Sequence, residues 1–244
     1  MQPRVFFRNE WSVAAMINSN GFGGNYRYGQ RINAADKRLY EIDFAYIKDI
    51  KEKKMPAGSQ AMVVNGKKNL AFNFRFGYGK QHEQFRKHDL GGVAIRRFYN
   101  FGASLALLKP IYYDLYESGT YTFLPPEKYD PRWYDQNLRI AGRASFFKGF
   151  KEIGVIPGVF GKFGYNFEFG NHDRKIHALE AGLIAEGFLK KLEIMDYTYL
   201  GSHPKKVAQN RQLFLTIFLN YRFGKIVDPY EVKKKRERSI EISY

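Results

Sequence analysis

Residues 69–80 read NLAFNFRFGYGK, and this stretch decides the fold of the 244-residue chain. Every second residue from Leu70 to Tyr78 is apolar, with three phenylalanines between these two ends. The intervening positions hold alanine, asparagine, arginine and glycine. Strict alternation is the pattern of a β-strand with two opposite faces. A soluble barrel turns its apolar face inward and a membrane barrel turns it toward lipid, so the orientation of this face decides the class of protein.

The same alternation recurs about eight times along the chain. We expect strands over residues 4–17, 25–32, 38–50, 69–86, 93–117, 155–169, 176–192 and 211–225. The stretch 93–117 is predicted to be one strand rather than two, because its alternation continues through Asn100–Gly102. Pro110 predicts a bulge or a strand end within it, since proline has no N–H for the sheet. Residues 141–153, AGRASFFKGFKEI, are expected to include a short helix.

The connections between the expected strands alternate in length. Short polar links are expected at 34–37, 88–92 and 171–175. A glycine-rich turn at 19–24 and long loops at 51–68, 118–154 and 193–210 fall at the opposite end. Short turns at one end and longer loops at the other are typical of outer-membrane barrels.

The composition narrows the possible functions. The chain has no cysteine, which excludes disulfides and thiolate metal sites. Its formal net charge is +16, and an excess of this size suggests nucleic acid, anionic lipid or an acidic polymer as a neighbour. No run approaches the ~18 apolar residues of a transmembrane helix. The first residues, MQPR, lead into a strand pattern without a signal peptide, and we interpret the chain as a mature, exported form whose signal peptide has been removed.

Side-chain volume predicts which face lies outside. An eight-stranded barrel has an interior just wide enough to be filled by side chains. The aromatic face would overfill so narrow a lumen, whereas the opposite face is rich in glycine, alanine, serine and asparagine. We therefore expect the aromatic face to contact lipid. The predicted lipid-facing residues are Trp11, Tyr40, Phe44, Phe72, Phe74, Phe76, Leu105, Phe163, Phe167, Leu215, Ile217 and Leu219.

The opposite face becomes the lumen, and its charges are balanced, with seven of each sign. An isolated buried charge costs several kcal/mol, so we expect an interlocked ion-pair network that closes the barrel rather than an open pore. Arg75 is predicted to pair with Glu41 or Asp43 of the neighbouring strand. The predicted network comprises Arg8, Glu10, Arg27, Arg31, Glu41, Asp43, Arg75, Arg96, Lys162, Glu168, Glu180, Glu186 and Arg222, together with Asp49.

Five stretches carry a resemblance to known proteins: GGNYRYGQRIN (23–33), LYEIDFAYIKDIKE (39–52), GASLALLKPIYYDLYE (102–117), GRASFFKGFKEI (142–153) and LNYRFGKI (219–226). On these residues the chain resembles the small eight-stranded outer-membrane barrels of Gram-negative bacteria, the OmpA/OmpX type. It is most similar to a family of uncharacterised outer-membrane barrel proteins. The resemblance implies a fold and a location and no particular activity. The chain departs from the pattern because a tail follows Phe223, where a terminal aromatic residue would close the last strand.

Side chains with catalytic or metal-binding potential do not form a recognisable site. The five histidines at 82, 88, 172, 177 and 203 lie in predicted turns and loops or at a strand start, without metal-ligand spacing. Ser104 and Ser145 have no histidine near them in sequence. The side chain of His177 has outward parity and that of Glu180 inward parity. A Ser–His–acid set could still assemble across strands, but no motif indicates one. We expect no metal and no cofactor.

The sequence thus predicts an all-β, eight-stranded antiparallel up-and-down transmembrane barrel with a closed, charged interior, formed by residues 1–225. We expect it in the bacterial outer membrane, with the basic tail 226–244 in the periplasm. The predicted function is that of a non-enzymatic structural or accessory subunit of an outer-membrane protein assembly. Phe146, Phe147 and Phe150 are expected either to cover the barrel mouth or to contact another subunit. The alternatives are a small enzyme acting on envelope lipid and a narrow channel.

The expected partners follow from this location. They are outer-membrane lipid and other outer-membrane proteins, with peptidoglycan or anionic lipid as candidates for the tail. Nucleic acid is not expected, because the basic run at 233–238 is not accompanied by aromatic side chains that could stack on bases.

Overall fold

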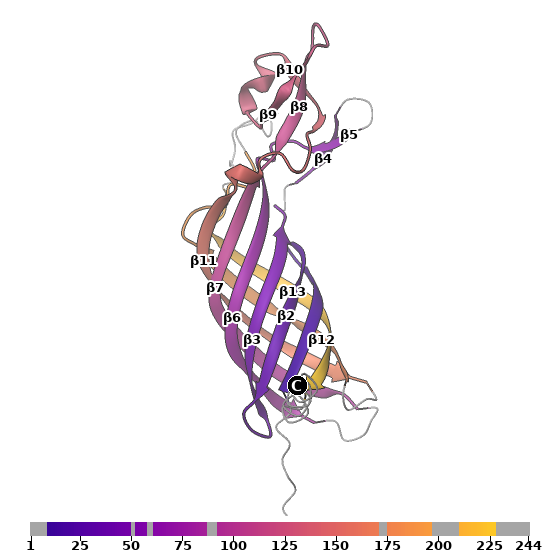
Figure 1. The fold of residues 1–244 in the computed structure, drawn as a ribbon, viewed down its shortest axis with the longest axis vertical. Helices are drawn as coiled ribbons and strands as arrows, with labels where there is room; N and C mark the ends of the chain where they lie inside the picture. The colour runs from indigo at the N-terminus through magenta and orange to yellow at the C-terminus, as the bar shows by residue number, and fades with distance from the viewer. Residues whose placement is uncertain are drawn as a thin grey trace, which may run out of the picture.

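A computed structural model describes residues 9–49, 52–57, 61–86, 92–170, 175–196 and 210–227. Eight long strands form a closed antiparallel barrel (Figure 1). They are β1 (Asn9–Asn18), β2 (Gly21–Arg31), β3 (Asp36–Ile47), β6 (Asn69–Phe85), β7 (Ala94–Pro110), β11 (Gly154–Phe169), β12 (Lys175–Phe188) and β13 (Leu213–Val227). Each barrel strand pairs with the next barrel strand along the chain, and β1 pairs with β13 to close the circle. The predicted eight-stranded up-and-down barrel is confirmed.

Some of the sequence predictions fall outside the described residues. They concern Arg8, His88, His172, His203, most of the turns at 88–92 and 171–175, and the basic tail beyond Val227. The division into a barrel at 1–225 and a tail at 226–244 therefore stays a prediction.

Beyond the long-loop end of the barrel the chain builds a smaller unit, here called the head (Figure 1). The head is a three-stranded sheet of β8 (Tyr112–Glu117), β9 (Phe123–Lys128) and β10 (Leu138–Arg143), in the order β10-β8-β9, with the 3-10 helix η1 (Pro131–Tyr134). A hairpin of β4 (Lys54–Ala57) and β5 (Ala61–Val64) contacts β10. The loops expected at 118–154 and 51–68 thus contain short strands that the sequence pattern did not predict.

The prediction of a single strand over 93–117 is wrong at its far end. β7 continues through Asn100–Gly102 as expected, but it ends at Pro110, and β8 begins at Tyr112 in a different sheet. Ile111, between the two strands, is buried in the core of the head. Its N–H donates to the carbonyl of Lys68 at 2.9 Å. The chain changes sheet here because proline offers no N–H with which to continue the barrel ladder.

The short helix expected within 141–153 is present only as a 3-10 helix near the end of that stretch. Gly142 and Arg143 complete β10, and only Phe150–Glu152 form a single 3-10 turn, η2. Gly149 precedes this turn with φ 86°, in the left-handed region, so a right-handed helix cannot pass through it. No helix within the described ranges is long and apolar enough to cross a membrane.

Exposed apolar side chains alternate with buried ones along the barrel strands, and the polar side is the buried one. On β13, Leu215 and Ile217 are 70% and 65% exposed, while Asn220 and Arg222 are buried. A soluble protein does not expose a continuous apolar surface of this extent. A closed barrel, in contrast, can place it against lipid, because it has no unpaired strand edge.

The barrel mouth at the long-loop end is closed by the chain that follows β12. The backbone N–H groups of Lys68 and Asn69 both donate to the carbonyl of Ile194, at 3.0 and 3.2 Å. Around this contact, loop side chains pack against inward-facing side chains of the barrel in one apolar cluster: Phe188, Leu192, Ile194 and Met195 against Ile47, Ala71, Ala106 and Leu108. The segment 188–195, and not 118–154, therefore covers the mouth.

Candidate functional site

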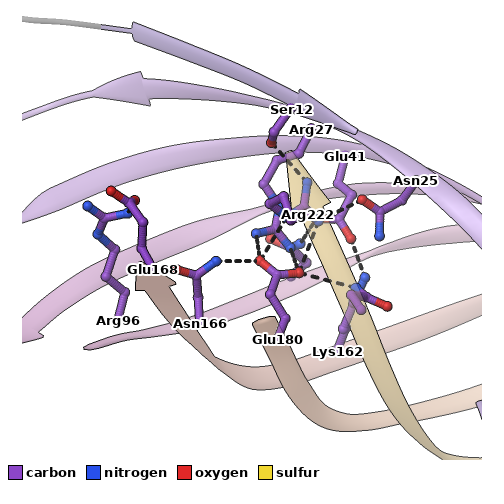
Figure 2. A network of polar contacts seen from close by, with 12 residues as sticks. Ser12, Asn25, Arg27, Glu41, Arg96, Lys162, Asn166, Glu168, Glu180 and Arg222 are labelled. Atoms are coloured by element: carbon purple, nitrogen blue, oxygen red, sulfur yellow. Dashed lines mark hydrogen bonds and ion pairs between the residues drawn. The ribbon is translucent and has the colours of Figure 1, made fainter. Parts of the chain in front are cut away.

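Inside the barrel, one buried carboxylate joins two arginines (Figure 2). Glu180 of β12 accepts two hydrogen bonds from Arg222 of β13, from Nε at 2.9 Å and from Nη2 at 3.0 Å. Nη1 of Arg27, on β2, donates to Oε1 of the same carboxylate at 2.5 Å. The planar guanidinium of arginine is suited to this two-point pairing with a carboxylate.

A second carboxylate, that of Glu41 on β3, extends the network across the lumen. It accepts from Arg27 on one side and from the ammonium of Lys162, on β11, on the other. The Lys162 ammonium also donates to Asp43 at 3.1 Å. Charges of opposite sign therefore alternate along a continuous chain of contacts, here called the central network: Arg222, Glu180, Arg27, Glu41, Lys162 and Asp43.

Neutral side chains occupy the remaining positions around the central network. The guanidinium of Arg27 lies 4.5 Å from the ring centroid of Phe98, and the ammonium of Lys162 lies 5.0 Å from that of Phe218. Amides and one hydroxyl complete the hydrogen bonds of the charged groups: Asn166 and Asn220 donate to Glu180, Asn100 donates to Glu41, and Ser12 and Asn25 accept from Arg222. A buried charge needs such partners, because unsatisfied polar groups are costly in a medium of low dielectric constant.

The predicted partner of Arg75 is wrong. Arg75 lies directly opposite Asp43 in the β3–β6 register, but it forms a two-point ion pair with Glu186 of β12, with both distances at 2.9 Å. Asn73 donates a further hydrogen bond to Glu186 at 2.7 Å. In so narrow a barrel the inward side chains reach across the lumen, so the nearest residue in the sheet is not the necessary partner.

Further ion pairs lie nearer the short-turn end of the lumen. Arg96 of β7 pairs with Glu168 of β11 and approaches Glu83 at 3.4 Å. Lys37 of β3 pairs with Glu10 of β1. Lys37 is a residue that the sequence prediction missed, because it was assigned to a connection. It shares the parity of Glu41, and that signal could have identified it.

Two residues of the predicted network lie elsewhere. Arg31 is the last residue of β2, and its guanidinium donates to the backbone carbonyls of Asn33 and Ala34 in the turn that follows. Asp49 lies beyond the end of β3. The prediction for Asp49 extended the parity of β3 past its end, whereas Arg31 is still in β2 but lies next to a turn whose carbonyls its side chain reaches.

The predicted lipid-facing side chains share the outer face of the barrel. Their exposure is greatest on β13, and it is intermediate for Phe72 and Phe74, where neighbouring aromatic rings and the head approach. The set is Trp11, Tyr40, Phe44, Phe72, Phe74, Phe76, Leu105, Phe163, Phe167, Leu215, Ile217 and Leu219. Within the described ranges, the outward-facing side chains of this set are exposed or half-buried rather than buried.

The residues proposed for a lipid hydrolase are on opposite sides of the barrel wall. Ser104 is fully buried in the lumen, whereas His177 is on the outer side and lies 3.4 Å from the hydroxyl of Tyr221. A serine nucleophile needs its base within hydrogen-bond reach, so these two do not form a catalytic pair. Within the described part of the chain, no group of three or more histidine or acidic side chains could hold a metal ion.

The chemistry of the lumen is that of a closed, neutral interior. The half-buried Glu83 is shared between Arg96 and the exposed Arg86. Apart from it, six cations face six carboxylates in the pairs described: Arg27, Lys37, Arg75, Arg96, Lys162 and Arg222 with Glu10, Glu41, Asp43, Glu168, Glu180 and Glu186. All are buried. A set that is balanced and mutually hydrogen-bonded does not leave a charged path for ions.

Comparison with known proteins gives fold-level likeness only. No family model matches the chain, and no curated protein matches it. Among solved structures, Neisserial surface protein A is 10% identical, with a TM-score of 0.39 over 91% of this chain and 96% of that one. Ail, the attachment invasion locus protein of Yersinia pestis, is 7% identical, with TM-scores of 0.39 alone and 0.40 in complex with the heparin analogue sucrose octasulfate. Each Ail structure covers 90% of this chain and 97% of its own. At these values the matches carry no argument about this chain.

The class of the protein follows from its own structure. A closed eight-stranded antiparallel barrel, apolar outside and charged inside, with short turns at one end and long loops at the other, is the architecture of a small outer-membrane barrel. The protein is a closed eight-stranded transmembrane β-barrel with a charged interior.

Proposed function

We propose that the protein is a non-enzymatic structural or accessory subunit of an outer-membrane protein assembly, and that the head is its contact surface. The observation that carries the proposal is an exposed stack of aromatic rings on a head that has its own core. Because short turns face the periplasm in such barrels, the head points away from the cell.

The core of the head supports a rigid contact surface. Trp133 of η1 packs edge-on against Tyr113 and Tyr129, with ring centroids 6.0 and 5.4 Å apart. The Tyr113 hydroxyl donates to the carbonyl of Lys67 at 2.8 Å, and burial raises the pKa of this phenol. The head is thus fixed to the rim of the barrel by packing and hydrogen bonding, and a surface ordered in advance loses less entropy on binding.

The exposed aromatic stack lies on β8, β9 and the turn between them. The rings of Tyr116 and Tyr121 are nearly parallel at 8°, with centroids 6.1 Å apart, and Phe123 lies 6.4 Å from Tyr116. Tyr121 and Phe123 are both 73% exposed. Tyr121 has φ 55°, a left-handed conformation that is strained for a tyrosine and that clusters at functional positions. Exposed aromatic side chains are enriched in the centres of protein interfaces.

A second aromatic surface supports contact with a subunit within the membrane plane. Phe146, Phe147 and Phe150 pack on one another beside Lys109 at the end of β7. Phe147 remains 79% exposed. Since the segment 188–195 already covers the barrel mouth, contact with another subunit is the better supported of the two roles expected for these rings.

The experiment is purification of the full chain from its native membrane in mild detergent. We expect a partner protein to co-elute in fixed stoichiometry and to be lost from a Tyr121→Ser/Phe123→Ser variant. Leu189→Ser is the matched control, because Leu189 is also 73% exposed at the long-loop end but is outside the head. Elution of the wild-type protein alone, or equal retention of the partner by the two variants, would contradict the proposal.

The tail remains part of the proposal as a periplasmic contact with peptidoglycan or anionic lipid. Deletion of residues 228–244, which keeps all of β13, is expected to weaken binding to sedimented peptidoglycan or to anionic vesicles without changing the fold of the barrel. Equal binding of the shortened and the full chain to peptidoglycan and to anionic vesicles would contradict a contact role for the tail.

The narrow channel and the lipid enzyme are less well supported. Single-channel recording in planar bilayers is expected to show no conductance steps, because both the central network and the segment 188–195 obstruct the lumen. Ser104→Ala and His177→Ala are expected to leave the envelope lipid profile unchanged. Conductance steps in the wild-type recording would support the channel. An altered lipid profile in either variant would support the lipid enzyme.

A further inference from the structure

On the outer wall, the lipid-facing side chains change from aromatic to cationic as the strands approach the short-turn end. Antiparallel register places Lys80 of β6 between Arg38 of β3 and Tyr99 of β7, with Phe163 of β11 next in the row. The row one step closer to the turns joins Asp36, His82 and Arg97 in the same way. Tyrosines followed by lysine or arginine mark the level where the hydrocarbon core meets the lipid head groups.

A cavity opens on this wall. Its volume is about 330 Å³, and it is lined by Asp36, Lys80, His82, Arg97, Tyr99 and Phe163. Lysine, arginine and histidine side chains therefore share a concavity with two aromatic rings. A second, largely apolar hollow of about 470 Å³ lies on the strand positions that follow toward the membrane centre, between Tyr40, Tyr78 and Phe101. The two hollows share no lining residue, but they occupy neighbouring positions on β6 and β7. A polar cavity beside an apolar hollow suits an amphipathic ligand.

The cations in this region are available to a ligand. Among the described residues, the side chains of Lys80 and Arg97 form no ion pair and no hydrogen bond, and both are exposed.

The one carboxylate in the cavity is already engaged by its neighbours. Oδ1 of Asp36 lies 2.7 Å from Nδ1 of His82, and Oδ2 accepts from Asn33 at 2.8 Å. Both oxygens of this carboxylate therefore already have partners, and the contact with His82 holds the imidazole in place. Among the residues lining the cavity, two fixed cations thus outnumber one paired carboxylate.

We propose that this cavity binds the phosphate of an anionic glycerophospholipid in the periplasmic leaflet, with Lys80 and Arg97 contacting the phosphate and an acyl chain lying along Tyr78 and Phe101. Arginine and lysine are the side chains that pair best with phosphate oxygens. Basic pockets at the membrane boundary are known lipid head-group sites. The apolar hollow at the neighbouring strand positions favours the phosphate of a lipid over a free anion. This site is independent of the head and of the proposed assembly role.

The test compares two double variants of the full chain that lose the same charge at the same end of the barrel. Lys80→Gln/Arg97→Gln removes the two cations of the cavity. Lys175→Gln/Lys225→Gln is the matched control, because Lys175 and Lys225 are paired in register, exposed and directed outward on the β12–β13 wall. Palmitoyl-oleoyl-phosphatidylglycerol is titrated into each protein in dodecyl maltoside, and bound lipid is counted by native mass spectrometry. Inorganic phosphate in large excess is the competitor.

We expect the cavity variant to bind phosphatidylglycerol roughly 25-fold more weakly than wild type, since each cation near an anionic lipid contributes a factor of about five. The control variant should match wild type, and inorganic phosphate should not displace the lipid. The single variants, each about fivefold weaker, serve if the double variant does not fold. Equal affinity in the two double variants overturns the proposal, and complete displacement by inorganic phosphate assigns the site to a free anion instead.

Discussion

The ion pair between Arg75 and Glu186 offers the sharpest test of how the closed lumen contributes to stability. Both side chains are buried, and their two contacts are each 2.9 Å. Arg75→Met leaves the Glu186 carboxylate with only the amide of Asn73 as a hydrogen-bond donor. Removing one member of a buried pair costs about 3–5 kcal/mol, because the other charge stays buried without compensation. Glu186→Met leaves the buried guanidinium of Arg75 without its carboxylate partner. This variant is expected to lose a similar amount of unfolding free energy.

The double variant Arg75→Met/Glu186→Met tests whether the loss of stability in the single variants comes from the buried charge left without a partner or from loss of the ion pair itself. Two apolar side chains of similar length fill the space without a charge, and only the buried amide of Asn73 loses its acceptor. The unfolding free energy is therefore expected about 1–3 kcal/mol below that of wild type, a smaller loss than in either single variant. The assay is equilibrium urea unfolding in lipid vesicles, followed by tryptophan fluorescence. Lys68→Met is the control, because its pair with Glu193 is exposed and 3.3 Å long, and exposed pairs contribute about 0–1 kcal/mol. A double variant as unstable as the single ones would refute the reasoning.

Three further perturbations test packing and the attachment of the head. Gly79→Ala is expected to abolish folding into vesicles, measured by heat-modifiable gel mobility, because its Cβ would lie 1.8 Å from a backbone carbonyl of β7; Gly161→Ala, with no atom within 4 Å, should fold normally. Tyr113→Phe is expected to cost about 1 kcal/mol and to speed proteolysis of the head, since it loses a 2.8 Å hydrogen bond; equal cleavage rates would contradict this. Hydrogen bonds from Lys128 and Tyr112 lower the pKa of Glu152, so this contact stabilises the head above the ordinary carboxyl pKa and is lost as pH falls through the lowered value. Protection of the η2 amides, corrected for the intrinsic exchange rate at each pH, should therefore fall at acid pH in wild type and stay unchanged in Glu152→Gln.

The strand pattern could be predicted because a β-strand turns alternate side chains to opposite sides. Leu215 and Ile217 on one side and Asn220 and Arg222 on the other are separated by parity alone. The narrow lumen of an eight-stranded barrel then excludes the aromatic face from the interior, which gives the membrane orientation. Errors arose at strand ends, because the pattern does not locate the first and last residues of a strand. Arg31, the last residue of β2, was assigned to the lumen network, and Lys37, the second residue of β3, was assigned to a connection.

The head was not predictable from alternation. β8, β9 and β10 are six residues long each, and β9 contains Pro125 and Pro126. These strands are held by a core that draws residues from distant parts of the chain, including Val63 and Leu70. Such contacts bring together segments with no common periodicity, so a local pattern does not contain them.

The sequence by itself determined the number of barrel strands, their inward and outward faces and the balance of charge in the lumen, because these depend on a local period of two residues and on side-chain volume. Only the tertiary structure decided which charges pair, since strand stagger brings Glu186 rather than Asp43 to Arg75 across the lumen. It also decided that the cations Lys80 and Arg97 share a cavity on the outer wall. In the stretch 69–80, parity placed Arg75 inside and Tyr78 outside. Closure of the barrel then brought Glu186 to Arg75 and Phe101 to Tyr78.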